Sequence, residues 1–152
     1  MRQDTRARTA ANIQTYGQHV IRVARSSDDP VGFLPFAYTI GNHGRGLPEL
    51  LLIGDSSALY NRILNILGQI QRERGHAFQH GELVDFSARL PARIVNAGRR
   101  GRDEYAIQAG VFYGTNDFAV RQVLLPDQNG RFPGDTGCLP PYSDQPVLAA
   151  VH

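Results

Sequence analysis

The stretch FLPFAYTIGNHGRGLPELLLIGD, residues 33–55, decides the fold. Two apolar runs, residues 36–40 and 50–53, flank a loop that contains three glycines and a proline. Short apolar runs bounded by glycine and proline are typical of β-strands. Because a sheet is rigid while the loops at its ends carry most chemistry, the stretch predicts two strands joined by a candidate functional loop.

Length and composition predict one soluble domain over residues 1–152. The hydrophobic share of 41% and the charged share of 20% are ordinary for a globular protein. No apolar run approaches the roughly 20 residues of a membrane-spanning helix, and residues 1–14 lack the apolar core of a secretion signal. We therefore expect a cytoplasmic protein that does not enter a membrane.

The charge distribution argues against a nucleic acid partner. All 16 basic side chains are arginine, they are scattered along the chain, and the formal net charge is only +2. A nucleic acid footprint needs clustered positive charge. The single cysteine, Cys138, cannot form an internal disulfide. We expect no nucleic acid polymer as a partner and no cofactor.

The rest of the sequence alternates helical and strand patterns. Apolar residues at helical spacing predict a long helix that Asp55 or Ser56 caps and that Gly75 ends. Further helices are expected over 4–16 and 103–113, strands over 19–24, 83–87, 92–96 and 118–125, an exposed turn over 98–102 and an extended segment over 140–148. These elements predict an α+β fold, a single domain with a curved, mostly antiparallel sheet flanked by two or three helices.

The loop of residues 41–49 is the first candidate for anion binding. Its glycines let backbone N–H groups approach a phosphate, and Arg45 can add a bidentate contact. The glycine spacing matches neither a dinucleotide-binding fingerprint nor a Walker loop, so a plain connection between strands remains the alternative. Asp55 and Ser56 follow a strand as an esterase nucleophile block does, but no matching Asp-x-x-His follows, so helix capping is favoured.

Two further groups are weaker candidates. His76 and His80 would share a face if they were helical, but Gly75 and Gly81 bracket them, so we expect surface histidines rather than a metal site. Three arginines between residues 99 and 102 could contact phosphate. No aromatic side chain is interleaved with them, so a solvated turn is favoured.

Three separated motifs carry a family resemblance. They are FAYTIG at residues 36–41, PEL at 48–50 and PDxxGRFP at 126–133. In this order they resemble the bacterial and phage domain-of-unknown-function family numbered 4262, and the resemblance runs from Tyr16-Gly17 to Gln145-Pro146. The chain departs from the family pattern at Asn42, where leucine is expected, and at Gly134, where tryptophan is expected. The resemblance implies a shared fold and a shared site, but it supplies no activity.

The motifs suggest one composite pocket. We expect the loop after residue 40 and the loop after residue 125 to meet at one end of the sheet. The pocket residues would be Tyr38, Thr39, His43, Arg45 and Glu49 from the first segment, and Gln122, Asp127, Arg131 and Phe132 from the second. Aromatic faces, two guanidinium groups and oxygen acceptors suit a planar, phosphate-bearing molecule. The alternative is that residues 127–130 form only a tight turn, which Arg131 holds by pairing with a carboxylate.

These expectations favour non-catalytic binding of a nucleotide-like, phosphate-bearing small molecule by a protein that self-associates into a homo-oligomer. If the gene belongs to a phage, the role would be sequestration of a signalling nucleotide as a counter-defence. The sequence contains no recognisable nucleophile with a matching base and no complete set of metal ligands. Two alternatives remain open: a small hydrolase or transferase with His43 or Glu49 as general base, and a protein-interaction module with exposed loops.

Overall fold

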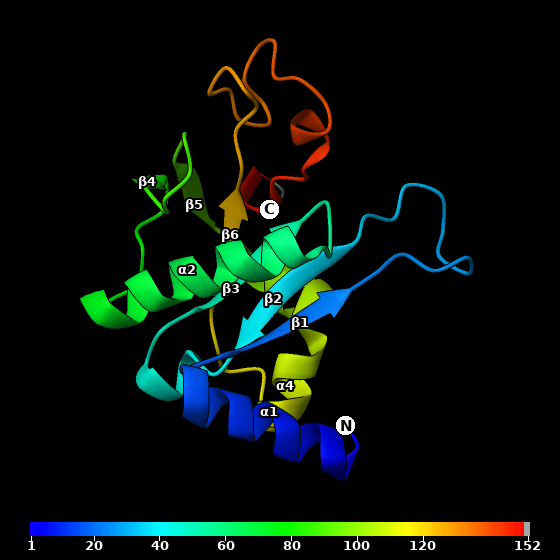
Figure 1. Cartoon of the computed structure of the whole chain (residues 1–152). Helices are drawn as coiled ribbons and strands as arrows, with labels where there is room; N and C mark the ends of the chain where they lie inside the picture. Colours follow the sequence, from blue (N-terminus) through cyan, green and yellow to red (C-terminus); the bar gives the residue numbers. More distant parts are fainter. Residues whose placement is uncertain (151–152) are drawn as a thin grey trace.

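The computed structural model describes residues 1–150, and its strands form one sheet in the order β1-β2-β3-β6-β5-β4 (Figure 1). The strands are β1 (His19–Val23), β2 (Phe36–Ile40), β3 (Glu49–Ile53), β4 (Glu82–Val84), β5 (Ala92–Asn96) and β6 (Val120–Leu124). The helices are α1 (Gln3–Tyr16), α2 (Ala58–Arg74), α3 (Gly98–Arg100) and α4 (Ile107–Tyr113), and short 3₁₀ turns are η1 (His43–Arg45), η3 (Tyr142–Asp144) and η4 (Leu148–Ala150). The predicted α+β class is confirmed.

One parallel pairing lies inside an otherwise antiparallel sheet. β3 and β6 run parallel, with Glu49 opposite Val120 and Leu51 opposite Gln122. The remaining neighbours in the described sheet pair antiparallel, as predicted. Because β2 is antiparallel to β3, the loop that leaves β2 lies at the end of the sheet where β3 begins. β6 is parallel to β3, so β6 begins at this same end. The loop that leaves β6 therefore lies at the opposite end.

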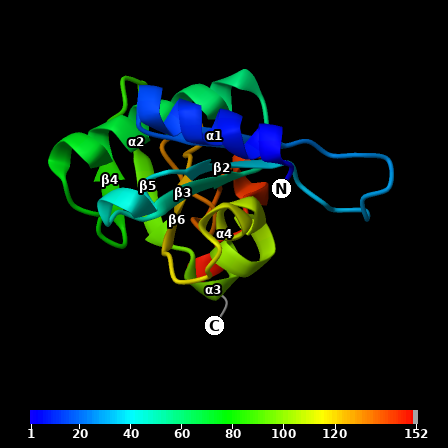
Figure 2. The ribbon, with the colours of Figure 1, turned by 90° about the horizontal axis from the view of Figure 1, so that it is seen from below.

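Helices cover both faces of the sheet (Figure 2). α2 packs Leu64 and Leu67 on one face, in a buried cluster with Leu52 of β3. α4 and the C-terminal segment cover the other face, where Leu51 and Ala109 belong to a second buried cluster. Every residue of β3 is buried, as its unbroken leucine and isoleucine pattern predicts. Within residues 1–150, no helix combines the length and apolar character that crossing a membrane requires.

α2 begins later than the sequence predicts. Its N-cap is Ser57, not Asp55 or Ser56, and no side chain caps its first turn. Asp55 instead accepts a hydrogen bond from the backbone N–H of Ser56. The other end of the helix matches the prediction, because Gly75 adopts a left-handed conformation with φ of 76° and donates its N–H to the carbonyl of Gln71.

Residues 98–102 are not the exposed turn that their arginines predict. α3 leads into a π-helical turn, Gly101–Tyr105, and α4 follows. Gly101 is buried, and a Cβ at this position would lie 2.4 Å from Cβ of Ala97 and 3.3 Å from the side chain of Val120. The close packing of this glycine against β6 draws the segment onto the sheet, and only the arginine side chains reach outward.

Two buried glutamines hold the C-terminal segment against the sheet. Residues 140–148 are not extended as predicted but include η3 and the start of η4. Gln145 accepts the N–H of Leu125 at 2.9 Å and donates to the carbonyl of Leu125 at 2.7 Å. Gln122 of β6 donates to the carbonyl of Pro146 at 2.5 Å and accepts the N–H of Leu148 at 3.0 Å. These side chains supply the hydrogen bonds that a neighbouring strand would otherwise make.

Replacing Gln145 with alanine should loosen this segment. The change leaves the buried N–H and C=O groups of Leu125 without partners, at a cost of about 1–3 kcal/mol. Urea unfolding measures the loss of stability, and amide hydrogen exchange should become faster at Leu125. Gln128→Ala, on an exposed loop, is the matched control. Equal stability of the two variants would contradict the role of Gln145.

Candidate functional site

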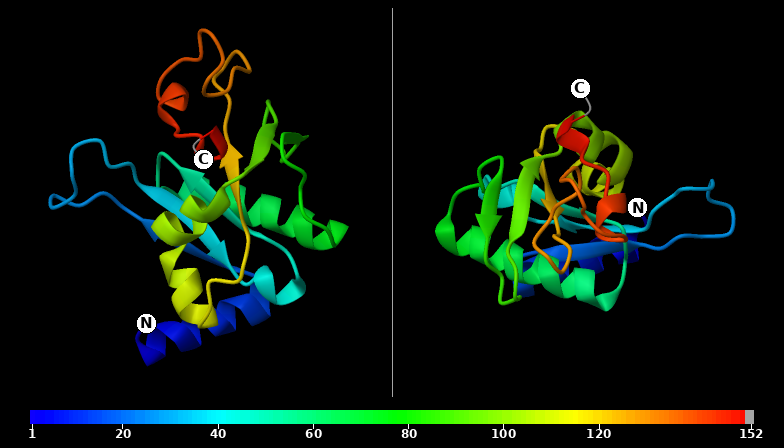
Figure 3. Two further views of the ribbon diagram at one scale, coloured as in Figure 1. Left: turned by 180° about the vertical axis from the view of Figure 1, so that it is seen from behind. Right: turned by 90° about the horizontal axis from the view of Figure 1, so that it is seen from above.

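The two loops that were expected to share one pocket lie at opposite ends of the sheet (Figure 3). Arg45 lies between β2 and β3, whereas Arg131 follows β6. The loops would meet only if β3 and β6 ran antiparallel, and these two strands are parallel. The prediction of one composite pocket is therefore wrong.

Asp127 and Arg131 belong to a self-contained turn at the far end of the sheet. The Asp127 carboxylate accepts the backbone N–H groups of Asn129 and Arg131, each at 2.9 Å. It also accepts the N–H of Leu139 at 2.9 Å. Desolvation by itself would raise the pKa of the Asp127 carboxyl group, but these backbone hydrogen bonds hold that pKa below its usual range. Arg131 donates to the carbonyl of Gly137 at 3.3 Å, so the backbone around Asp127, rather than an ion pair of Arg131, holds the tight turn.

Phe132 and Gln122 also make contacts that hold the fold. Phe132 is buried in a small cluster with Val95 and Leu124. The guanidinium group of Arg93 lies over its ring, 4.3 Å from the centroid. Gln122 binds the C-terminal segment, as described above. The second group of predicted site residues, Gln122, Asp127, Arg131 and Phe132, thus makes contacts that hold the C-terminal part of the fold together.

Glu49, from the first group, is the centre of a buried hydrogen-bond network. It is 0% exposed. Its carboxylate oxygens accept hydrogen bonds from the Thr39 hydroxyl at 2.8 Å, the N–H groups of Gly41, Asn42 and His43 at 3.2, 3.3 and 3.0 Å, the Asn42 amide at 3.2 Å and the Tyr113 hydroxyl. Thr39 itself accepts the N–H of Leu50 at 2.9 Å, and Tyr113 accepts the N–H of Gly41 at 2.6 Å. Both hydroxyl protons are therefore free to point at Glu49.

This network makes Glu49 an anchor rather than a general base. Burial raises the pKa of the Glu49 carboxyl group, and the hydrogen bonds from Tyr113, His43, Thr39 and Asn42 oppose that shift. Burial and the charge of Glu49 raise the pKa of Tyr113, so its hydroxyl remains a donor. A general base must reach the proton that it abstracts. The Glu49 carboxylate is sealed from solvent and its acceptor positions are occupied.

The side chains of Tyr38 and His43 line the same side of the fold without joining the network, to which His43 contributes only its backbone N–H. Tyr38 is 1% exposed, and its hydroxyl accepts the N–H of Gln108 at 3.0 Å. Burial raises the pKa of Tyr38 to about 12, against the effect of that hydrogen bond. The ring of His43 is half-buried and packs edge-on against Tyr113, with 4.9 Å between the centroids. Tyr38 therefore supports the packing of α4, and His43 covers the Glu49 anchor.

Asn42 links the Glu49 anchor to a second polar cluster. Its side chain donates to Oε1 of Gln18 at 2.9 Å and accepts a hydrogen bond from Arg72 at 3.0 Å. Arg72, on α2, also donates to Oε1 of Gln18 at 2.7 Å and to the carbonyl of Tyr16 at 3.3 Å. The end of α1, the start of β1, α2 and the β2–β3 loop meet at these side chains.

Two glycines permit this close approach. A Cβ at Gly68 of α2 would lie 2.0 Å from Oε1 of Gln18, and a Cβ at Gly17 would lie 2.6 Å from Nε of Arg72. Gly17 also has φ of 90°, a left-handed conformation that other residues adopt only with strain. Both positions therefore require glycine if Gln18 and Arg72 are to keep their places.

The cluster borders a polar cleft between α1, β1 and α2, which we call the α1–α2 cleft. Its inner part encloses about 450 Å³ and its outer part about 520 Å³. Both parts are lined by Tyr16, Gln69 and Arg72. The inner part is also lined by Asn12, Gln18, His19, Val20, Asn61 and Asn65. The outer part is also lined by Gln14, Thr15, Gly17, Arg45 and Glu73. Amide side chains dominate the inner part, and two guanidinium groups face the outer part.

Arg45 and Arg72 give the outer part donors without a carboxylate partner. Burial lowers the pKa of Arg72, the charge of Arg45 lowers it further, and the charges of Glu49 and Glu73 oppose the shift. Within residues 1–150, neither arginine forms an ion pair. Glu73 accepts a hydrogen bond from Gln69 at 3.0 Å instead. An anion that entered the outer part would meet the exposed Arg45 guanidinium and the N–H groups of Arg72 that its hydrogen bonds to Gln18, Asn42 and the Tyr16 carbonyl leave over, with Glu73 at the rim.

His19 is the imidazole of the inner part. Its Nδ1 lies 2.9 Å from the side-chain amide nitrogen of Asn12. Burial, and then the positive charge of Arg8, lower the pKa of His19. The ring is therefore neutral at about pH 7, and it presents Nε2–H as a donor when Nδ1 accepts from Asn12.

The histidines at positions 76 and 80 lie in the connection between α2 and β4, outside any helix. Nδ1 of His80 accepts the N–H of Asn96 at 3.0 Å, and Nδ1 of His76 lies 3.3 Å from the carbonyl of Ala77. In the part of the chain that the structure describes, no group of three or more His, Cys, Asp or Glu residues could hold a metal ion. The two rings serve separate local contacts.

Sequence reasoning missed most of the α1–α2 cleft. One signal was available, because Asn61, Asn65 and Gln69 recur every four residues along α2 and so share one face. No comparable signal exists for the pair of Gln18 and Arg72, which lie 54 positions apart in the chain. A stripe of amide side chains beside the apolar stripe of α2 is therefore the sequence pattern that identifies the α2 side of the cleft.

The fold and the cleft define an α+β protein with an open sheet and a polar groove beside its β1 edge. The family model described as "Domain of unknown function (DUF4262)" matches residues 12–139. The chain therefore belongs to this family, as its three motifs predict. No curated protein and no solved structure matches the chain.

Glu49→Gln should destabilise the fold by about 3 kcal/mol or more, because buried donors left without acceptors cost about 1–3 kcal/mol each. The glutamine amide would place its own N–H groups against donors that now point at the carboxylate. Urea unfolding measures the difference. Glu73→Gln removes the same charge from the exposed face of α2 and should cost less than about 0.5 kcal/mol. Similar losses for the two variants would rule out the anchor role.

Acid should destabilise the protein through His19. The pKa of His19 is lower in the folded protein than in the unfolded chain, so the unfolded state binds the proton more tightly. The stability that the neutral ring contributes is present above the unfolded pKa and is lost as the pH falls below about 6.5. Urea unfolding from about pH 7 to about pH 5 should therefore show a smaller loss for His19→Gln than for the unchanged protein. Parallel pH profiles would contradict this assignment.

Proposed function

We propose that the protein binds a nucleotide-like, phosphate-bearing small molecule in the α1–α2 cleft, without catalysis. The proposal rests on one observation: the cleft combines a wall of amide side chains with two arginines that form no ion pair in the described part of the chain. Small-molecule sites commonly enclose about 300–1,000 Å³ and use a few well-placed polar groups. Both parts of the cleft have volumes in this range.

The outer part is suited to the phosphate of such a ligand. Guanidinium groups present planar pairs of N–H donors that match phosphate oxygens. Arg72 is held in place by hydrogen bonds to Gln18, Asn42 and the carbonyl of Tyr16, so little freedom remains for it to lose on binding. Arg45 is exposed and can close on the ligand from the β2–β3 loop.

The inner part is suited to the base. Asn61, Asn65 and Gln69 carry side-chain amides, each with donors and an acceptor, which is the chemistry that reads the edge of a nucleobase. Tyr16 is 69% exposed at the end of α1 and borders both parts of the cleft. An exposed aromatic ring at this place offers a surface on which a base can stack.

The same residues favour retention of the ligand over its turnover. The amide and guanidinium groups that dominate the cleft keep one protonation state near neutral pH, whereas general acid–base catalysis needs groups that gain and lose a proton. His19 is the exception in the inner part, and its Nδ1 is engaged by the side-chain amide of Asn12 at 2.9 Å. Glu49 is sealed in its network, and His43 covers that network rather than lining the cleft. Sequestration therefore fits the cleft better than hydrolysis or group transfer. An interaction module would not require a cleft of this chemistry.

Mass spectrometry of the released ligand tests the proposal. Protein purified from the cells that produce it is denatured, and the small molecules set free are identified. A second sample is first incubated with a mixture of ribonucleoside mono-, di- and triphosphates. An unchanged nucleotide in either sample supports sequestration. A converted nucleotide would indicate an enzyme, and the absence of bound nucleotide from both samples would overturn the proposal.

Arg45→Gln should weaken binding of the nucleotide found in this way by about tenfold, since a hydrogen bond to a charged group contributes about 1.5–3 kcal/mol. Isothermal titration calorimetry measures the affinity. Arg62→Gln removes the same charge from an exposed position of α2 outside the cleft and should leave the affinity unchanged. If both variants bind alike, Arg45 does not contact the ligand.

A further inference from the structure

A second basic cleft lies where β6 begins, and the α1–α2 cleft does not include it. It encloses about 380 Å³ and is lined by Asn96, Gly98, Arg99, Arg102, Phe118, Ala119, Val120 and Arg121. We call it the β5–β6 cleft, because the end of β5, α3 and the start of β6 bring these residues together. Among the residues that the structure describes, its lining contains three arginines and no carboxylate.

Acidic neighbours satisfy part of this positive charge. Arg102 donates to both oxygens of Asp103, at 2.8 and 3.2 Å, and to the carbonyl of Asn116 at 2.8 Å. Arg100, next to the cleft, pairs with Glu104 at 2.9 Å. The hydrogen bond from Arg102, and more weakly the charge of Arg99, lower the pKa of Asp103. Arg102 and Arg100 are thus committed to partners within the chain.

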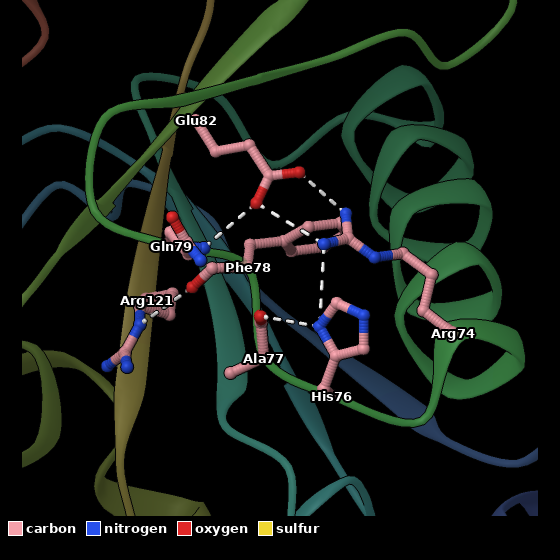
Figure 4. Close-up of polar contacts among 7 residues, drawn as sticks. All are labelled: Arg74, His76, Ala77, Phe78, Gln79, Glu82 and Arg121. Carbon is pink, nitrogen blue, oxygen red and sulfur yellow. Dashed lines mark hydrogen bonds and ion pairs between the residues drawn. The ribbon is translucent and has the colours of Figure 1, made fainter.

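Arg99 and Arg121 are not committed in this way. Neither forms an ion pair within residues 1–150. Nε of Arg121 donates to the carbonyl of Phe78 at 3.4 Å, while its two Nη atoms point away from the other residues drawn in Figure 4. Burial lowers the pKa of Arg121, which is half-buried. A partly buried cation with unfilled donors loses hydration without compensation, so an anion at its Nη atoms would stabilise it.

The local backbone holds these two side chains at the cleft. Gly101 packs so closely on Ala97 and Val120 that α3 is fixed against the start of β6. No atom of residues 1–150 lies within 4 Å of the place where a Cβ of Gly98 would stand, so these residues leave the cleft open at this point. The π-helical turn that follows α3 belongs to a rare class that frequently occurs at functional sites.

We propose that the β5–β6 cleft binds a phosphoryl group between Arg99 and Arg121. Two guanidinium groups match the oxygens of phosphate or pyrophosphate, and the exposed amide of Asn96 adds a further donor. No acidic side chain in the lining repels such an anion. The volume exceeds the needs of one phosphate, so the phosphoryl group of a larger small molecule fits as well. This site is separate from the nucleotide proposal, because it shares no lining residue with the α1–α2 cleft.

Arginine side-chain NMR of the full chain tests the site with inorganic phosphate and pyrophosphate as probes, at constant ionic strength in sodium chloride. The Nε–H resonances of Arg99 and Arg121 should shift and saturate with added pyrophosphate. Arg99→Gln should weaken this binding by about tenfold or more, because it removes a charged hydrogen-bond donor. Arg100→Gln makes the same change one position away, in a side chain that pairs with Glu104, and should alter the affinity less than about twofold.

Three results would overturn the proposal. The first is the absence of a saturable shift at Arg121 with either probe at millimolar concentration. The second is equal weakening by Arg99→Gln and Arg100→Gln, which would indicate diffuse attraction to surface charge. The third is a saturable shift confined to Arg45 and Arg72, which would support the α1–α2 cleft alone. Arg121→Lys keeps the charge and the aliphatic stem, so it should weaken pyrophosphate binding while the urea midpoint stays unchanged.

Discussion

A buried carboxylate at the first position of a central strand holds this structure together. Glu49 carries a carboxyl group into the protein interior, which is tolerated only when hydrogen bonds replace the lost water. The donors are backbone N–H groups, an amide and two hydroxyls, so dipoles rather than a paired cation satisfy the carboxyl oxygens. Through them, one side chain fixes the β2–β3 loop and joins β2 and β3 to α4.

The polar cleft depends on that anchor. Asn42 contacts Glu49 with its backbone and side chain, and the same side chain contacts Gln18 and Arg72. The position of the Arg72 guanidinium is therefore set in part by Asn42, which does not line the cleft itself. Networks of this kind are stabilising only when every member is satisfied. The buried hydrogen bonds of Glu49 and Asn42 thus help to fix the side chains that line the cleft, as a preorganised binding site requires.

The fold could be predicted from the sequence where local patterns decide it. The unbroken apolar run of β3, the periodicity of α2 and the glycines at positions 17 and 75 each act through nearby residues, and those elements were found. The direction of β6 relative to β3 depends on the path of the chain through α2, β4 and β5, and no local pattern encodes it. The composite pocket was wrong for this reason alone.

The candidate site shows the same division. Thr39, His43 and Glu49 lie together because they belong to one loop and its flanking strands. Their role could not be predicted, because it depends on Tyr113, whose hydroxyl comes from a helix far along the chain. The arginines of residues 99–102 show a second limit. Their sequence is typical of a solvated turn, and it is the packing of Gly101 on β6 that brings Arg99 into the lining of the same cleft as Arg121.

The order of the strands has a consequence for how the chain reaches this state. β6 is the last of the described strands to be synthesised, yet it lies between β3 and β5. Until it leaves the ribosome, β3 and β5 each expose an unpaired edge, and such edges promote misassembly of nascent chains. Joining Glu49 to Val120 also closes a long loop, which slows the search for the native topology. Translation of this final strand is thus the event that unites two partly formed halves.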